Sequence, residues 1–387
     1  MKIAILLESN HSGGGGFTHS VTTTSEMIKY LGKSNKITVY THLPANLKIL
    51  KKLGIPTNLF KNNIFDKILI KFSSYTIFRI IFKFLNFQTS IEKILLNKKT
   101  DIIFFPSASN TIYALNKINF IFHLLDLEHW KHSIYPEIDK KEFNYRENLY
   151  FYSLNKSLLN ITSHELIKKQ IVKHYRVASK KIIVIPYATQ KNFFWKNKNK
   201  QIFFKKKYKK LKDYFFYPAQ IWGHKNHLII LKAAKIVQSK GYNIKFIFSG
   251  KDRGYKETLK KYIKQHHIKN IIFTGFLPND EMDYVYRSSK GIIFTSFFGP
   301  NTLVSLETWR YKKPLIYNKK LSDCPSGTAI LIDPKDPRSV SNAIIDVIDN
   351  KYKDKFISNG VSQLRVIEQQ NKSGYSKLNI RLRHLKS

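Results

Sequence analysis

The sequence is short of cysteine, acidic residues and long apolar stretches. Its single cysteine, Cys324, excludes a disulfide framework and any zinc site built from cysteines. No apolar run reaches the roughly 18 residues that a membrane-spanning helix needs. Only 26 Asp and Glu oppose 67 Lys and Arg, so the formal net charge of the 387 residues is +41. Disorder is nevertheless excluded, because 43% of the residues are hydrophobic and 14% are aromatic.

A positive charge of this size suggests a nucleic-acid-binding protein, but the type of basic residue argues against that class. Lysine accounts for 57 of the 67 basic residues and arginine for 10. Arginine is the residue favoured for recognition of phosphates and bases, because its planar guanidinium binds bidentately. A lysine excess together with many Asn, Ile, Phe and Tyr is typical of AT-rich coding bias. We therefore expect no nucleic-acid partner, and a basic polyanion-binding protein is the less favoured alternative.

Length and periodicity predict two α/β domains. A chain of 387 residues is longer than a single hydrophobic core usually serves. Residues 2–7 form a short apolar run that is typical of a buried strand and too short for a secretory signal, so we expect a cytoplasmic protein. A helix is predicted over 18–31, and strands alternate with helices as far as 182–186. The alternation restarts at 214–218 and continues to 314–317, which predicts doubly wound layers.

A lysine-rich block divides the two predicted layers. Residues 191–212 contain ten lysines and no acidic residue, which is typical of a solvated linker. We therefore predict an N-terminal, acceptor-binding domain at 1–190 and a C-terminal, donor-binding domain at 213–365. Residues 366–387 are predicted to form a C-terminal helix that packs back on the N-terminal domain.

Polar residues gather after the predicted strands of the second half, where open parallel sheets bind ligands. Lys225 lies at a helix entrance after the strand at 214–218. Its ammonium and the free backbone N–H groups suit a diphosphate, although a capped turn with an exposed lysine explains the spacing equally well. A Gly-Pro-Asn-Thr turn at 299–302 offers further donors to phosphate oxygens. Glu307, in the helix that follows, is either an acceptor for sugar hydroxyls or an ordinary solvated helix residue.

Four stretches of the second half resemble the donor-binding half of the retaining glycosyltransferases of family 4, once called group 1. They are 217–227, 273–282, 294–302 together with Leu306 and Glu307, and 329–337. Their order and spacing match across roughly 130 residues, and the best match is the subgroup with Gly-Pro-Thr-Asn before the acid. The resemblance implies the GT-B fold, in which two doubly wound Rossmann-like domains face a central cleft.

The same resemblance implies the residues that bind the donor. Lys225 matches the lysine of a basic pair that grips the donor diphosphate, and Gln220 stands at the position of the pair's usual arginine. Glu307 matches the second of two acids eight positions apart, whereas the first falls on Gly299. Phe276 falls where the nucleobase meets the backbone. The complete implied donor set is Gly15, Gly16, Gln220, Lys225, Phe276, Gly299, Asn301, Thr302, Leu303 and Glu307.

The first half resembles the family more loosely. The glycine run at 13–16 follows the first strand, where the family has a loop close to the donor phosphates. Glycine lets a backbone approach a ligand closely, but a lone run also suits a flexible turn. The stretch 122–137 resembles a segment that faces the acceptor, with Asp126 and His129 on its motif positions. The implied catalytic residues are His123, Asp126, His129 and Glu307.

Histidines at positions 123, 129 and 132 also raise the possibility of a zinc site. The resemblance argues against it, because GT-B enzymes neutralise phosphate charge with lysine and helix ends. We therefore expect neither a catalytic metal nor another cofactor.

The implied reaction is the transfer of a hexose-type sugar, with retention, from a UDP- or GDP-sugar to a glycan or a lipid-linked glycan. Such a step serves cell-surface polysaccharide or lipopolysaccharide biosynthesis. The transition state should resemble an oxocarbenium ion, with charge growing on the leaving phosphate. Asp126 or His123 would orient the acceptor or the donor. An inactive GT-B relative is the alternative, because the first acid is missing. The sequence does not specify the sugar, the linkage, the acceptor or the oligomeric state.

Residues 61–99 interleave bulky apolar residues with cations. Basic amphipathic helices bind anionic membranes, and each cation near the surface adds about 1 kcal/mol. A helix that faces the core with lysines outside is an equally good interpretation. We predict peripheral association with the inner face of the membrane.

Overall fold

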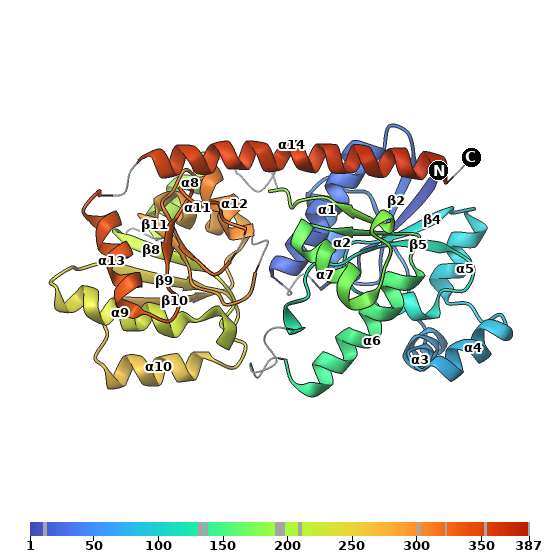
Figure 1. Cartoon of the computed structure of the whole chain (residues 1–387), viewed down its shortest axis with the longest axis horizontal. Coiled ribbons are helices and arrows are strands. Elements are labelled where there is room, and N and C mark those ends of the chain that lie inside the picture. Colours follow the sequence, from blue (N-terminus) through green and yellow to red (C-terminus); the bar gives the residue numbers. More distant parts are fainter. Residues whose placement is uncertain are drawn as a thin grey trace. The chain divides into compact units, whose positions relative to one another are not determined.

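The computed structural model describes residues 1–10, 14–130, 135, 138–189, 198–207, 211–299, 303–321, 323–351 and 354–385. The chain divides into two compact units. Unit 1 contains Met1–Ser133, Ile138–Ala188 and Glu368–Ser387, and unit 2 contains Ile134–Glu137 and Thr189–Ile367. Figure 1 shows that helices cover both faces of the sheet in each unit.

Unit 1 is built on a seven-stranded parallel sheet with the order β3-β2-β1-β4-β5-β6-β7. The strands are β1 (Lys2–Leu6), β2 (Lys36–Thr41), β3 (Thr57–Leu59), β4 (Ile102–Phe105), β5 (Asn119–His123), β6 (Leu159–Thr162) and β7 (Ile182–Val184). The central strand β1 pairs with β2 and β4, so that Ile5 lies opposite both Val39 and Phe104. Nearly continuous apolar runs form these strands because both faces of the sheet are covered.

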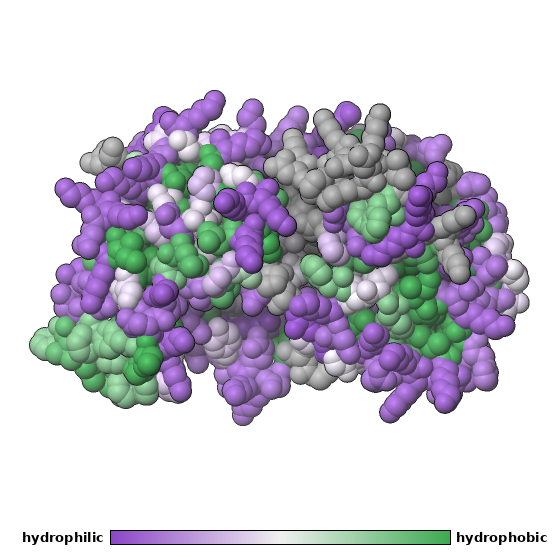
Figure 2. Space-filling model, turned by 180° about the vertical axis from the view of Figure 1, so that it is seen from behind, coloured by the Kyte–Doolittle hydropathy of each residue, from purple (hydrophilic) through white to green (hydrophobic). Residues whose placement is uncertain are grey.

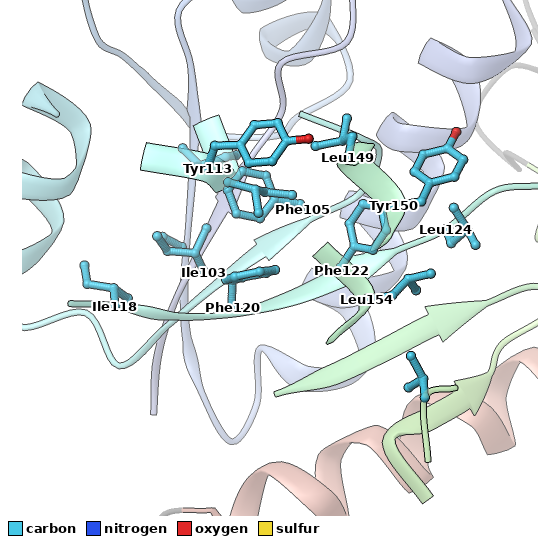
Figure 3. Packing of buried hydrophobic residues seen from close by; sticks show 14 of the residues in the cluster. Ile103, Phe105, Tyr113, Ile118, Phe120, Phe122, Leu124, Leu149, Tyr150 and Leu154 are labelled. Atoms are coloured by element: carbon cyan, nitrogen blue, oxygen red, sulfur yellow. The ribbon is translucent and has the colours of Figure 1, made fainter. Parts of the chain in front are cut away.

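The helices of unit 1 connect these strands. They are α1 (Gly15–Leu31), α2 (Pro44–Lys52), α3 (Ile64–Ser73), α4 (Thr76–Phe84), α5 (Ser90–Asn97), α6 (Lys140–Lys156) and α7 (Glu165–Tyr175), with the short 3₁₀ helices η2 (Asn110–Ala114), η3 (Glu128–Trp130) and η4 (Ser179–Lys181). Successive strand residues point to opposite faces and therefore supply two separate cores. One contains Phe105, Phe122 and Leu149, shown in Figure 3, and the other contains Ile5 and Phe104.

Unit 2 is built on a six-stranded parallel sheet with the order β10-β9-β8-β11-β12-β13. The strands are β8 (Tyr214–Pro218), β9 (Lys245–Ser249), β10 (Ile271–Gly275), β11 (Gly291–Phe294), β12 (Leu315–Asn318) and β13 (Ile330–Ile332). The helices are α8 (Lys198–Lys207), η6 (Gly223–Lys225), α9 (His227–Ser239), α10 (Lys256–Gln265), α11 (Asn279–Ser288), α12 (Leu303–Arg310), α13 (Pro337–Ile348) and the first part of α14 (Asp354–His384). The predicted fold class, two doubly wound Rossmann-like layers, is confirmed.

Part of the stretch predicted as a solvated linker is helical. Within α8, the Phe204 side chain is buried and packs near the ring of Tyr284, at 6.1 Å between centroids. Lys207 Nζ lies 2.9 Å from Glu281 Oε1 on α11. The helix attaches to unit 2 through these contacts, which a count of lysines along the sequence does not reveal.

The long helix α14 has a glycine at each of two close approaches. A Cβ at Gly360 would lie 2.2 Å from Cδ1 of Trp309 in unit 2, and a Cβ at Gly374 would lie 3.0 Å from Cγ1 of Ile185 in unit 1. In unit 1, Asn371 Nδ2 donates to Pro186 O at 2.8 Å.

None of the described helices combines the length and the apolarity that crossing a membrane requires.

Candidate active site

Two loops at the carboxyl end of the unit 2 sheet lie directly against each other. Ile221 N donates to Lys251 O at 3.0 Å, and Arg253 N donates to Ile221 O at 3.2 Å. Glycine is required at position 250 for this approach, because a Cβ there would lie 2.5 Å from Ala219 O. The loops after β8 and β9 therefore continue side by side beyond the sheet.

This pairing brings Arg253 to Gln220, the residue that stands where the family has an arginine. Arg253 Nε donates to Gln220 Oε1 at 3.1 Å, and Trp222 Nε1 donates to the same oxygen at 3.1 Å. The guanidinium carbon lies 5.6 Å from the centre of the Trp222 ring. Sequence reasoning missed Arg253. The available signal was its place between Gly250 and Gly254, directly after a strand.

Lys225 lies between the ends of β8 and β11, immediately before α9. Its carbonyl oxygen accepts hydrogen bonds from Tyr217 Oη at 2.7 Å and from Thr295 Oγ1 at 3.3 Å. Its Nζ lies 5.6 Å from the centre of the Phe294 ring. Asn226, with φ of 55°, turns the chain into α9. Lys225 thus lies at the carboxyl end of the sheet, two residues before the first residue of α9, and its role in binding a diphosphate stays a prediction.

Glu307 lies on α12 and is held by a tyrosine. Tyr286 Oη donates to Glu307 Oε2 at 2.6 Å, and the Tyr286 ring stacks on that of Tyr311 at 4.8 Å between centroids. Burial of the carboxyl group raises the pKa of Glu307 to about 7, against a smaller opposite effect of the Tyr286 hydrogen bond. The group therefore changes charge near neutral pH.

At position 299, where the resemblance leads us to expect the first of the two acids, the surrounding packing suits a glycine. A Cβ at Gly299 would lie 2.8 Å from Cδ2 of Leu321, so a longer side chain needs this leucine to move. The neighbouring Phe298 ring stacks on His224 at 4.0 Å between centroids. Gly299 is therefore packed as a glycine, and the space of an acid is taken by an apolar side chain.

The remaining residues of unit 2 that were predicted to bind the donor are Phe276, Leu303, Asn301 and Thr302. Phe276 follows Gly275, which has a φ of +69°, and its side chain is 54% exposed beyond β10. Leu303 is the first residue of α12 and is partly exposed. Asn301 and Thr302 lie outside the described residues.

Gly15 and Gly16 form the first turn of α1, three residues earlier than the predicted start of that helix. Gly14, with φ of 66°, is the residue before the helix. A Cβ at Gly15 or Gly16 would meet no atom within 4 Å. Packing within unit 1 does not demand glycine at these two positions, and their small size leaves open space at the amino end of a 17-residue helix.

His123, the last residue of β5, is deeply buried beside His19. The two rings meet edge to face at 4.7 Å between centroids, and the Tyr187 ring lies 4.2 Å from His19. Burial lowers the pKa of His123 to about 3, so this imidazole is neutral at physiological pH. Neither of its ring nitrogens has a hydrogen-bond partner among the described residues. Sequence reasoning did not anticipate His19.

Asp126 and His129 follow the same strand but differ in access. The Asp126 side chain is 40% exposed, and its Oδ1 accepts a hydrogen bond from Glu128 N at 3.1 Å. His129 is fully buried, and its Nε2 lies 2.6 Å from Glu147 Oε1. Burial lowers the pKa of His129, and Glu147 opposes that shift. Asp126 can reach a ligand from solvent, whereas His129 fastens the loop to α6.

No group of three or more His, Cys, Asp or Glu side chains that could hold a metal ion occurs in the described part of the chain. His132, one of the three histidines that suggested zinc, lies outside the described residues.

The sequence of unit 2 matches a known family. Residues 198–363 match the family described as Glycosyl transferases group 1. The predicted resemblance is confirmed at this level, and the enzyme class predicted from the sequence, a glycosyltransferase, is supported by it. The finer assignment to a subgroup of family 4 stays a prediction.

A curated relative covers part of the chain. The O-antigen chain mannosyltransferase RfbU of Salmonella typhimurium is 25% identical over 213 residues, which are 52% of this chain and 55% of that protein. The match therefore spans about half the length of each protein.

Solved structures share the fold along nearly the whole chain. A glycosyltransferase of Rickettsia africae has a TM-score of 0.71 and 15% identity, and the match covers 100% of this chain and 99% of the other. HepE of Anabaena, solved in complex with UDP-glucose, has a TM-score of 0.72 and 15% identity, covering 98% and 99%. These likenesses establish the GT-B fold.

Proposed function

We propose that this protein is a retaining glycosyltransferase that moves a hexose-type sugar from a UDP- or GDP-sugar to a glycan or lipid-linked glycan. The observation that carries the proposal is the group 1 match over unit 2, which has Lys225 and Arg253 in loops after its strands and Glu307 on α12. The complex of HepE with UDP-glucose and the name of RfbU support a nucleotide-sugar donor and a role in polysaccharide or O-antigen synthesis.

In the proposed donor site, two cations hold the diphosphate. Lys225 supplies an ammonium next to the start of α9, whose free N–H groups also favour an anion. Arg253 supplies the second cation in place of the arginine that Gln220 replaces, because Gln220 Oε1 holds its Nε at 3.1 Å. The guanidinium has further N–H donors for phosphate oxygens.

Glu307 is proposed to bind hydroxyl groups of the donor. An ionised carboxylate accepts several hydrogen bonds, and Tyr286 occupies only part of that capacity at 2.6 Å. Because the pKa of Glu307 lies at about 7, hydroxyl groups that favour the charged form should lower it on binding.

The proposed chemistry needs stabilisation of a leaving diphosphate. Its charge grows as the bond to the sugar breaks and the sugar becomes oxocarbenium-like. The two cations and the amino end of α9 stabilise that charge, without a metal ion or another cofactor being invoked. In unit 1, Gly15 and Gly16 leave open space at the amino end of α1, which is compatible with the donor-binding role that the resemblance implies for them. Neutral His123 and exposed Asp126 orient the acceptor or donor hydroxyls rather than act as nucleophiles.

We further propose that the protein acts at the inner face of the membrane. Helix α4 has no buried residue. The exposed fractions of Ile77, Ile80 and Phe84 are 71%, 63% and 88%. In Figure 2 the area around α3 and α4 is the hydrophobic region at the lower left. Lys83 of the same helix adds the attraction to anionic lipids that such a surface uses.

The experiment that tests the donor proposal is a thermal-shift and turnover panel with UDP-, GDP- and dTDP-sugars. We expect one nucleotide class to raise the melting temperature. Lys225→Ala and Arg253→Ala should each weaken its binding by roughly ten- to a hundredfold, because charge-assisted hydrogen bonds contribute about 1.5–3 kcal/mol. Lys232→Ala removes an exposed cation from α9 and should bind like the wild type. A chain that binds no sugar nucleotide, yet binds DNA with a steep salt dependence, is a polyanion-binding protein instead.

A second candidate function rests on Gly299. Because Leu321 occupies the space next to it, a GT-B relative that binds nucleotides without transferring sugar is the alternative. Nucleotide binding that is lost in Lys225→Ala, with no turnover of any donor, favours this alternative. Release of the nucleoside diphosphate during turnover favours the enzyme.

A further inference from the structure

Unit 1 contains a cavity of about 1040 Å³ that none of the predicted site residues lines. One wall is formed by residues that follow the carboxyl ends of β1, β2 and β4. Residues of α3 and α6 also line the cavity. Carboxyl ends of parallel strands are the usual ligand-binding edge of such a sheet. The volume is large enough for a ligand bigger than a monosaccharide.

The wall at the sheet is suited to hydroxyl groups. The Glu8 side chain, 10% exposed, accepts hydrogen bonds from Ser109 Oγ and, at 2.9 Å, from Thr111 Oγ1. His42 Nδ1 lies 3.4 Å from Glu8 Oε1. Tyr145 Oη, which donates to Asn110 Oδ1 at 3.1 Å, adds a phenol to the same cavity. A positioned carboxylate, hydroxyls and an amide are the partners that a saccharide needs.

The wall at α3 is suited to a phosphate group. Lys67 and Lys71 lie one turn apart on α3, and Lys61 precedes the helix. Among the described residues, no carboxylate pairs with these three ammonium groups. The acid of this helix, Asp66, is buried and accepts hydrogen bonds from Asn63 N and Ser90 N. Like charges one turn apart repel each other, and a bound anion relieves that repulsion.

The cavity continues into the exposed apolar surface of α3 and α4. Tyr75 lines the cavity and is also the residue from which α4 begins. Its ring lies 6.4 Å from that of Phe78 on α4. From the sheet to α4, the lining therefore offers first hydroxyl-binding groups, then lysines without a carboxylate partner among the described residues, and then an apolar surface.

We propose that this cavity binds the acceptor, and that the acceptor is a saccharide attached to a lipid through a diphosphate. Glu8 and its neighbours bind the sugar, Lys67 and Lys71 bind the diphosphate, and the lipid lies along α4. This inference rests on the proposed function, because it identifies the substrate that receives the donor sugar.

Farnesyl diphosphate is a ligand that tests the phosphate and lipid parts together. Its binding to the full-length chain is measured by calorimetry with UDP and GDP present in excess, so that the proposed donor site is occupied. We expect Lys67→Gln/Lys71→Gln to weaken binding at least tenfold. Lys169→Gln/Lys173→Gln is the matched control, since these lysines are also exposed and one turn apart, on α7. The control should bind like the wild type.

Two further ligands identify the source of the phosphate. Inorganic diphosphate should bind more weakly than farnesyl diphosphate, with the same dependence on Lys67 and Lys71, and farnesol should bind both proteins equally. Equal affinity of the wild type and Lys67→Gln/Lys71→Gln for farnesyl diphosphate overturns the inference. It is also overturned if the double variant loses affinity for phosphatidylglycerol vesicles by the same factor as for farnesyl diphosphate, because the lysines then bind lipid headgroups in general. The thermal shift with sugar nucleotides is independent of these outcomes, so failure of the donor proposal is recognised separately.

Discussion

Glu307, a partly exposed residue, combines a desolvated carboxyl group with a tyrosine partner, and this environment gives it a charge that depends on pH. Most glutamates are ionised throughout the physiological range, because their usual pKa is about 4.3. Here burial raises the pKa to about 7, so that protonated and ionised forms coexist near neutrality. The hydrogen bond from Tyr286 favours the ionised form but does not outweigh burial.

This shift predicts how stability changes with pH. Between about pH 4.5 and 7 the unfolded chain releases the Glu307 proton while the folded chain retains it. The contribution of this group is therefore fully present below pH 4.5 and is lost as the pH rises towards 7. Glu307→Gln should match the wild type in melting temperature at pH 4.5 and exceed it by several degrees at pH 8. Thermal unfolding across this range is the measurement.

The control for Glu307 is an exposed acid of the same unit. Glu257→Gln, on α10, should leave the difference from the wild type constant across the same pH range, because its side chain is 71% exposed. The donor proposal adds that sugar-nucleotide affinity of the wild type rises through pH 7, and that Glu307→Gln abolishes this rise. If both variants follow the wild type in stability, the shifted pKa is wrong.

At the scale of elements, α4 differs from an ordinary amphipathic helix of a globular protein. Such a helix packs its apolar stripe on the core. Helix α4 has no buried residue, although most of its residues are apolar. The neighbouring α3 is attached through buried Leu69 and Asp66. The sequence left open whether residues 61–99 form a core-facing helix or a membrane-binding amphipathic helix. Helix α3 faces the core on one side, as in the first interpretation, whereas α4 has its apolar side chains exposed, as the second requires.

Helix α4 supplies the prediction for the membrane. Ile77→Ser/Phe84→Ser should reduce binding to phosphatidylglycerol vesicles by more than about a hundredfold, because burying each side chain contributes about 1.5–3 kcal/mol. Val366→Ser/Ile380→Ser removes two exposed apolar side chains from α14 and should bind like the wild type. Co-sedimentation at low salt measures both. The proposal fails if the wild type does not sediment with these vesicles.

At the scale of the whole molecule, helix α14 contributes buried side chains to a hydrophobic core of unit 1 that also contains residues of β1. Tyr375, Leu378 and Leu382 of α14 are buried in the same cluster as Ile3 and Ile5 of β1. Unit 1 therefore contains residues from both ends of the sequence, and its folding requires a segment that follows unit 2 along the chain.

Leu378→Ala tests this dependence. Truncation of a fully buried leucine should cost about 2–5 kcal/mol, which is a large share of a domain's stability. Ile380→Ala on the same helix, where the side chain is 54% exposed, should change stability by less than about 0.5 kcal/mol. Chemical unfolding monitored by fluorescence gives both values. Sugar-nucleotide binding at unit 2 should survive in conditions where the Leu378→Ala protein remains folded, and equal stability of both variants would contradict the role of α14.

Much of the fold was predictable because strands in parallel sheets are local, apolar runs. The strands predicted at 2–7, 214–218 and 314–317 are found at Lys2–Leu6, Tyr214–Pro218 and Leu315–Asn318, within one residue of their predicted bounds. The short strands Thr57–Leu59 and Ile330–Ile332 were not predicted, because three residues carry too little pattern. The start of α1 was placed too late, since glycine is a poor indicator of a helix.

The sequence by itself determined the fold class and the family that residues 198–363 match, and it singled out Lys225 and Glu307 as candidate donor residues, because local patterns and motifs carry that information. Tertiary structure alone decided which distant side chains meet. It brought Arg253 to Gln220 through the approach at Gly250, and it filled the space beside Gly299 with Leu321. It also gathered Glu8, Lys67 and Lys71 around one cavity. Such contacts depend on how strands and helices are ordered in space. Local sequence patterns do not show which residues far apart in the chain come into contact.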